Sequence, residues 1–387
     1  MSDKPFHDPS LRGRHRSAWL FKWFTRIAII FTLSFLCFFL YNMARTAYPA
    51  LWQAYVEVDV SYSQAATHLS QKAIDKKYRR LVSRAWLRTI PAQLKQHPEL
   101  LGTSVRQWVL ADDQVDQYLK GHHHNLKQKQ IRLVEELQQS GRLELRWNDI
   151  ILSRGDSKIP ENAGMLSAMV GSVLTLFVTM LLAFPLGVMT AVYLEEFAKD
   201  NVLTRFIEIN INNLAAIPSI LFGVLGLAVF INLFGLPRSS ALVGGMTLAL
   251  MTLPIIIVSS RAALRSVPDS IRQAGYGLGL TRLQIVHGHV LPIATPGILT
   301  GSIIGLAQAM GETAPLIIIG MIAFIPDSPN TITEAATVLP AQIFTWAGMP
   351  ERAYVEKTAA GIIVILLVLF SLNAFAIYLR KKYEIKW

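Results

Sequence analysis

The sequence contains 387 residues, of which 52% are hydrophobic and only 16% are charged. Together with a mean hydropathy of +0.37, this composition excludes an ordinary soluble protein and indicates that lipid surrounds much of the chain. The net charge of +11 does not point to nucleic acid, because about half of the basic residues lie beside apolar runs, where anionic lipids attract them. The only cysteine, Cys37, lies within an apolar run, so an intramolecular disulfide is excluded.

Residues 1–26 form a basic tail, and the uncharged run Ile27–Ala44 follows it directly. Cleaved signal peptides also place a basic region before an apolar one. However, this run is long, and no A-x-A-type cleavage site follows it closely. We therefore expect residues 27–44 to form an uncleaved transmembrane anchor. The basic residues of the tail include Arg12, Arg14, Arg16, Lys22 and Arg26.

Residues 45–163 form the one sizeable polar block, and we expect them to fold as a separate domain outside the membrane. Val56, Val58 and Val60 alternate with acidic residues, which predicts a strand. Gln128–Gln139 has helical periodicity and is followed by Gly141 as a stop signal, and Arg142–Trp147 predicts a second strand. These patterns together predict an α+β domain.

Two clusters in this block could suggest metal binding, but simpler interpretations are favoured. Three adjacent histidines, His122–His124, follow Gly121 and are typical of an exposed turn. Asp112, Asp113 and Asp116 lack the spacing and the central glycine of a calcium-binding EF-hand, and they predict the start of a helix instead. Neither cluster supports a function.

Five further uncharged runs follow the polar block, and each is long enough to cross a hydrocarbon core about 30 Å thick. With the anchor, they predict an all-α polytopic membrane protein of about six transmembrane helices, with the α+β domain inserted after the first. Two runs exceed the length of one span, so their limits stay open. The runs are Met165–Leu194, Ile209–Pro237, Ser239–Ser260, Val290–Gly311 and Thr358–Leu379, all within a predicted transmembrane domain of residues 164–387.

The distribution of lysine and arginine predicts the orientation, because short cytoplasmic loops retain these residues. Sixteen of them lie in the four segments that would be cytoplasmic if the N-terminus is inside, whereas the short outer loops hold only Arg238, Arg352 and Lys357. The inside segments are residues 1–26, 195–208, 261–292 and 380–387. We therefore expect both termini in the cytoplasm and residues 45–163 in the periplasm.

The cytoplasmic loop of residues 261–292 is longer than a simple connection needs. Ser266 and Asp269 resemble a capping box, and glycines at 275, 277 and 279 would end the helix that it starts. Thr281 and Gln284 predict the start of a second short helix. Local chemistry leaves two alternatives open: the loop docks another protein, or it lies on the lipid surface.

One segment of this loop resembles the EAA loop of ABC-importer permeases, whose pattern is E-A-A-x3-G-x9-I-x-L-P. Ala274, Gly279, Leu291 and Pro292 agree with it, while Gln273, Gly275 and His289 replace Glu, Ala and Ile. The resemblance implies a type I ABC importer permease fold, in which this loop forms a coupling helix that docks on an ATP-binding subunit. The docking residues that it implies are Gln273, Ala274, Gly275, Gly279, Leu291 and Pro292.

Other motifs are similar to the PstA family, the permease subunits of phosphate-specific ABC transporters. They are Asn212–Ser219, Thr252–Pro254, Gly311–Pro315, Val338–Pro340 and the closing Arg380–Trp387. The resemblance is strong from Met165 onward, looser in the outer domain, and implies an extended N-terminal form of the family. It implies an inner-membrane complex with a PstC-like second permease, two PstB-like ATP-binding subunits and a periplasmic PstS-like phosphate-binding protein.

No G-x-x-x-x-G-K-[ST] motif occurs in the sequence, so this chain has no P-loop to hold nucleotide phosphates. We expect no cofactor in this chain, and the resemblance implies that the partner ATPase binds ATP and Mg²⁺. No set of nucleophile and base emerges either. We therefore expect a non-catalytic subunit.

Glu312 is the only ionisable residue from Val290 to Pro326, and a carboxylate at membrane depth is a candidate for function. Gly311 and Pro315 flank it and can interrupt the helix, which is tolerated where the backbone faces protein or a water-filled cavity. The alternative is a helix-end carboxylate at the outer interface. We expect a substrate path at Glu312, Gln308 and Thr313.

A carboxylate repels phosphate, so Glu312 more plausibly orients a cation. PstA-like sequences often carry arginine one turn earlier, but Gln308 stands there, and no Lys or Arg occurs from Leu283 to Glu351. The hypothesis is therefore an arginine from the partner permease. Two alternatives for the whole chain remain: a permease for another oxyanion such as sulfate or molybdate, and a membrane-anchored sensor.

Overall fold

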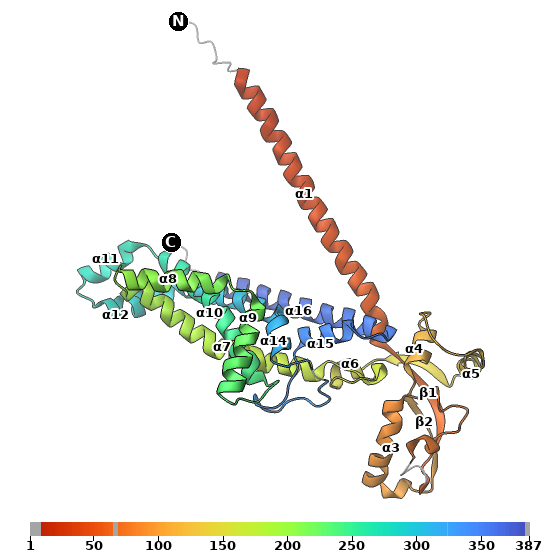
Figure 1. Cartoon of the computed structure of the whole chain (residues 1–387). Helices are drawn as coiled ribbons and strands as arrows, with labels where there is room; N and C mark the ends of the chain where they lie inside the picture. The colour runs from red at the N-terminus through yellow and green to blue at the C-terminus, as the bar shows by residue number, and fades with distance from the viewer. Residues whose placement is uncertain (1–8, 65–68, 323, 384–387) are drawn as a thin grey trace.

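The computed structural model describes residues 9–64, 69–322 and 324–383. The ends of the predicted cytoplasmic tails, residues 1–8 and 384–387, lie outside the described residues. Figure 1 shows a long first helix, a small domain containing a sheet, and an elongated helical bundle. Helices α11 (Asp269–Gly277) and α12 (Arg282–Ile285) lie at one end of the bundle, and the small domain lies at the other.

Helix α1, Pro9–Ala47, runs away from the bundle for most of its length (Figure 1). Large apolar side chains such as Trp19, Phe31 and Phe38 are exposed along it, as expected for a surface that faces lipid. At its end, Ala47 is buried and packs in one cluster with Tyr354 of α16 (Arg352–Tyr383). This arrangement fits the predicted anchor for the outer domain.

The outer domain is built on a three-stranded antiparallel sheet of order β2-β1-β3. Its strands are β1 (Trp52–Ser61), β2 (Ser104–Leu110) and β3 (Leu143–Trp147), and its helices are α3 (Arg84–Gln96), α4 (Asp113–Leu119), α5 (Gln128–Gln139) and α6 (Ile150–Ser153). The predicted α+β fold, both predicted strands and the helix at 128–139 are confirmed. Val56, Val58 and Val60 are fully buried and form one side of the domain core.

The two polar clusters have structural roles. Asp112 caps α4, whose first residue is Asp113, so the predicted helix start is confirmed. The turn at 122–124 is only partly exposed, because His122 Nδ1 lies 2.8 Å from Glu356 Oε1. Within the described ranges, no group of three His, Cys, Asp or Glu side chains is arranged to hold a metal ion.

The bundle contains four further helices that are long and apolar enough to cross a membrane, besides α1. Their bounds are α7 (Leu166–Val192) with η5 (Tyr193–Phe197), α10 (Ala241–Arg265), α12 (Arg282–Ile285) continuing through η7 (Val286–Val290) into α13 (Leu291–Gly311), and α16 (Arg352–Tyr383). Short helices α14 (Ala314–Ile318) and α15 (Leu339–Ala347) lie between α13 and α16. Buried Leu248 and Ile256 place α10 at the centre of the bundle.

The uncharged run at 209–237 is not one straight span. It divides into α8 (Val202–Ala215) and α9 (Ser219–Leu225) with η6 (Gly226–Leu233), and these two parts meet at 104°. Pro218 precedes α9 and disfavours helical backbone at Ile217, which explains the break. The described residues therefore contain five candidate spans, or six if the bent pair counts as one.

Buried charges join the outer domain to the outer end of α16. Lys120 Nζ lies 2.6 Å from Asp116 Oδ2 and 3.1 Å from Glu356 Oε2, and all three side chains are almost fully buried. The next residue of α16, Lys357, is also buried and donates to the backbone oxygens of Pro160 and Ala163. Because an unpaired buried charge is costly, these contacts hold the outer domain and α16 together.

Candidate functional site

Residues 261–292, the loop predicted to be cytoplasmic, form two short helices at the end of the bundle opposite the outer domain (Figure 1). Helix α11 spans Asp269–Gly277, and α12 begins at Arg282. The predicted capping box at Ser266 is wrong, because Ser266 closes the end of α10 and its hydroxyl donates to the Ala263 oxygen at 2.7 Å. The predicted capping box of Thr281 and Gln284 is confirmed, with both of its reciprocal contacts present.

Two glycines determine how the short helices meet. Gly275 is buried, and a Cβ atom there would lie 2.7 Å from Cγ1 of Ile285 in α12, so glycine allows the close approach. Gly279 has φ +77°, a left-handed conformation that glycine adopts without the steric cost of a side chain. The motif residues at these two positions therefore shape the turn, with Gly275 buried inside it and Gly279 exposed.

The outward face of this turn is apolar and exposed. Tyr276 and Leu278 are exposed, Leu278 by 80%, and Leu283 joins them from α12. Gln273 and Ala274 are also exposed on α11. Exposed apolar side chains of this kind are typical of a surface that contacts another protein or lipid.

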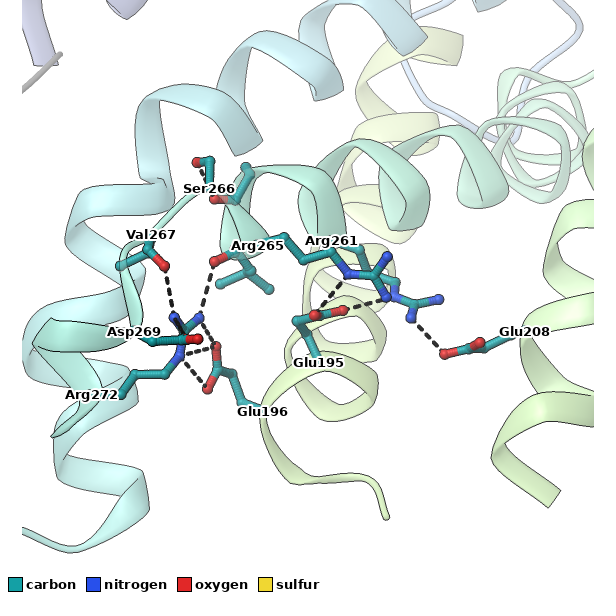
Figure 2. A network of polar contacts seen from close by, with 11 residues as sticks. Glu195, Glu196, Glu208, Arg261, Arg265, Ser266, Val267, Asp269 and Arg272 are labelled. Atoms are coloured by element: carbon teal, nitrogen blue, oxygen red, sulfur yellow. Dashed lines mark hydrogen bonds and ion pairs between the residues drawn. The ribbon is translucent and has the colours of Figure 1, made fainter. Parts of the chain in front are cut away.

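Arg272 anchors α11 to the end of the second span, as Figure 2 shows. Its Nη2 lies 2.6 Å from Glu196 Oε1, and both side chains are mostly buried. The same guanidinium donates to the backbone oxygens of Leu264 and Val267, which close α10. The Glu196 hydrogen bond is the main reason why the pKa of Arg272 is raised, and this favours its charged form.

Two further arginines, Arg261 and Arg265 of α10, extend this network to other elements (Figure 2). Arg261 contacts Glu195 at 3.2 Å and also Glu208 of α8, while Arg265 contacts Glu195 at 2.8 Å. The network therefore joins η5, α8, α10 and α11 at the base of the loop. We did not predict this network from the sequence. A signal was present, because acidic residues directly follow one uncharged run and arginines directly follow another.

The predicted path residues lie at the far end of α13. This helix ends at Gly311, Glu312 has extended backbone, and α14 begins two residues later, so the predicted interruption at Gly311 and Pro315 is present. No ion pair or side-chain hydrogen bond of Glu312 occurs within residues 9–64, 69–322 and 324–383. Its carboxylate is half-buried at this break.

Gln308 is exposed one turn before Glu312, and Thr313 is half-buried. Gln308 lies in the last turn of α13, and Glu312 directly follows the end of this helix. The predicted docking and path residues are not brought together. Helix α13 separates them by 21 residues, or about 30 Å, with Leu291 half-buried and Pro292 exposed at its first residues.

The profile of one protein family, described as "Binding-protein-dependent transport system inner membrane component", matches residues 183–385. This match covers just over half of the chain, including the short helices, the ion network and Glu312. The chain belongs to this family. The family match agrees with the predicted ABC importer permease fold, and helices α11 and α12 lie within the matched residues.

The N-terminal part of this permease matches a second profile, described as a domain of unknown function (DUF3333), over residues 8–77 and 66–129. These residues include α1, the sheet strands β1 and β2, and α4. The match ends at residue 129, so it includes the first helix and leaves out β3 and α6 of the outer domain.

Two curated relatives illustrate the similarity of the permease part. The probable ABC transporter permease protein YqgI of Bacillus subtilis is 31% identical over 233 residues, which cover 56% of this chain and 79% of the relative. The phosphate transport system permease protein PstA 1 of Mycobacterium tuberculosis is 31% identical over 225 residues, 57% of this chain and 73% of the relative. Among solved structures, the MetNI methionine ABC transporter is 17% identical with a TM-score of 0.43, covering 57% of this chain and 94% of that chain.

Proposed function

We propose that this chain is the PstA-like permease subunit of an ATP-driven phosphate importer in the bacterial inner membrane. The observation that carries the proposal is the anchored pair of helices α11 and α12 in a chain of this permease family, at the opposite end of α13 from Glu312. Similarity to the phosphate transport system permease protein PstA 1 supports phosphate as the substrate.

The complex would contain a second, PstC-like permease, two PstB-like ATP-binding subunits and a periplasmic PstS-like phosphate-binding protein. ATP and Mg²⁺ would bind to the ATPase, so this chain contributes no catalytic residue. The exposed side chains of Tyr276, Leu278 and Leu283 would enter a groove of the ATPase. Arg272 and its partner Glu196 would transmit the movement of that groove to the end of the second span.

The substrate path would pass the break after α13. Glu312 would pair with an arginine from the second permease, because its carboxylate faces a helix break and has no ionic partner in the described part of this chain. Gln308 would offer hydrogen bonds to the ion one turn away, and Thr313 could offer a hydroxyl. An arginine held by a carboxylate provides a fixed cation for phosphate.

The charge bias supports cytoplasmic termini and a periplasmic outer domain. We therefore propose a cytoplasmic tail at residues 1–26, an anchor at 27–44, a periplasmic domain at 45–163 and a permease domain at 164–387. In this orientation, the coupling loop at 261–292 lies on the side where ATP is available.

Reconstitution in liposomes with the three kinds of partner subunit tests the proposal. We expect labelled phosphate to accumulate only with ATP and the binding protein, and excess sulfate or molybdate not to compete. Competition by either ion would instead support a permease for another oxyanion. Binding of the partners without any ATP-dependent uptake would contradict transport and support the sensor alternative.

A further inference from the structure

The outer domain contains a cavity of about 430 Å³ that the proposed transport function does not use. It lies between the turn at residues 76–81, the start of α3, and the segment from α4 to α5. Its volume falls within the range of about 300–1,000 Å³ that is common for small-molecule sites. Most of the side chains around it are polar or charged.

Three arginines line this cavity: Arg79 and Arg80 from the turn, and Arg84 from the first residue of α3. No ion pair or side-chain hydrogen bond is formed by these guanidinium groups with any described residue. The Nε atom of Arg79 is buried without a hydrogen-bond partner. Because a buried donor without an acceptor costs free energy, the Nε atom of Arg79 favours a ligand that accepts hydrogen bonds, and the exposed side chains of Arg80 and Arg84 line the same cavity.

The other polar groups leave the cavity positive and rich in donors. Asp112 is the only acidic residue among the residues that line the cavity, so these residues carry a formal charge of +2. Burial raises the pKa of Asp112, and the amide of Gln114 and the charge of Arg84 oppose that rise. The side-chain oxygens of Gln114 and Gln130 already accept from the backbone amides of Asn125 and Lys127, at 2.7 and 3.0 Å.

We propose that this cavity binds a phosphate group, either as inorganic phosphate or as the phosphate monoester of a small molecule. A phosphate monoester carries about −1.5 to −2 charges at neutral pH, which balances the formal +2 of the lining residues. The planar guanidinium group also binds two oxygens of one phosphate at once. The inference does not depend on the proposed transport function, since the site belongs to the outer domain and not to α13.

The site is placed to affect the permease. An adjoining cavity of about 220 Å³ shares Arg84 and Asp112 with it. This second cavity is also lined by Glu161, before α7, and by Glu351, immediately before α16. A ligand at the three arginines would therefore lie next to the contact between the outer domain and the bundle.

Calorimetric titration of the full chain in lipid nanodiscs tests the proposal, with inorganic phosphate and glycerol 3-phosphate as separate probes. We expect at least one probe to bind, and Arg84→Gln and Arg79→Gln each to weaken that binding by about tenfold or more, since each removes a charged hydrogen bond. The matched control is Arg88→Gln, one turn further along α3, where the arginine is exposed and does not line the cavity. Its affinity should stay within about twofold of the unsubstituted chain, as expected for a surface charge.

Binding of inorganic phosphate alone would identify the free ion as the ligand, and binding of glycerol 3-phosphate alone would identify a monoester. The substitution Glu312→Gln should not weaken binding of the probe. This result would distinguish the cavity from the predicted substrate path at Glu312. Circular dichroism would verify that each variant is folded. The proposal is overturned if neither probe binds below about 10 mM, a dissociation constant weaker than most specific sites, or if Arg88→Gln weakens binding as much as Arg84→Gln.

Discussion

Replacing Glu196 by glutamine should loosen α11 from the end of the second span. The Glu196 side chain is only 5% exposed, and its removal leaves the mostly buried Arg272 without its main ionic partner. Loss of one partner of a fully buried pair costs about 3–5 kcal/mol. Because Arg272 keeps its bonds to two backbone oxygens and glutamine can still accept one bond, we expect a smaller loss of about 2 kcal/mol for local opening of α11.

Hydrogen exchange measures this opening directly. A loss of about 2 kcal/mol corresponds to exchange about 30-fold faster at the amides of residues 269–277. The matched control is Asp269→Asn, because Asp269 contacts the same guanidinium at 3.2 Å but its side chain is 84% exposed. An exposed pair is worth about 0.2–1 kcal/mol, so this variant should change exchange by only a few-fold. Equal effects of the two substitutions would refute the view that Glu196 anchors α11.

Three other predictions concern the turn, the path and the outer domain. Gly279→Ala should cost about 1 kcal/mol at φ +77° and lower ATP-dependent uptake, whereas Gly277→Ala, at an open position with ordinary φ, should not. Glu312→Gln should abolish phosphate uptake while leaving assembly with the ATPase unchanged, as judged by co-purification. The outer domain should lose stability from pH 5 to pH 8, because burial raises the pKa of Glu161 to about 7. Glu161→Gln should flatten this slope in thermal unfolding.

The sign of the pH effect follows from proton binding. A carboxyl whose pKa is higher in the folded state binds more protons there, so folding stability is greatest at low pH and falls as the pH rises toward 7. For Glu161, which starts from an ordinary value of 4.5, the change is on the order of 3 kcal/mol. Ser83 donates a hydrogen bond to this carboxyl, and nearby Asp112 and Asp113 disfavour its charge. An unfolding midpoint that rises with pH, or an unchanged slope in Glu161→Gln, would contradict this assignment.

Local patterns predicted those parts of the fold that depend on neighbours in the sequence. Alternation at Val56, Val58 and Val60 predicted β1, and the glycine stop after residue 139 placed the end of α5. The same local reasoning misplaced Ser266, because a serine between two helices can close the first or open the second. The hydroxyl of Ser266 bonds back to α10, and Pro268 occupies the position before α11.

Features that depend on distant residues could not be predicted in this way. Glu196 and Arg272 are 76 residues apart, and no periodicity encodes their contact. The uncharged run at 209–237 indicated an apolar segment but not the direction of its helices, so the bend of 104° appears only in the structure. The cavity at Arg79 and Arg84 likewise needs the turn and α3 to be placed against α4.

The central claim is that the turn between α11 and α12 docks on an ATP-binding subunit, and site-specific cross-linking tests it most directly. The chain has a single cysteine, so Cys37→Ser gives a clean background. In the assembled complex, Leu278→Cys should cross-link to the ATPase, whereas Phe234→Cys, equally available as an exposed apolar position after η6, should not. A Leu278→Cys chain that assembles but does not cross-link to the ATPase, or that does so no better than Phe234→Cys, would contradict the account.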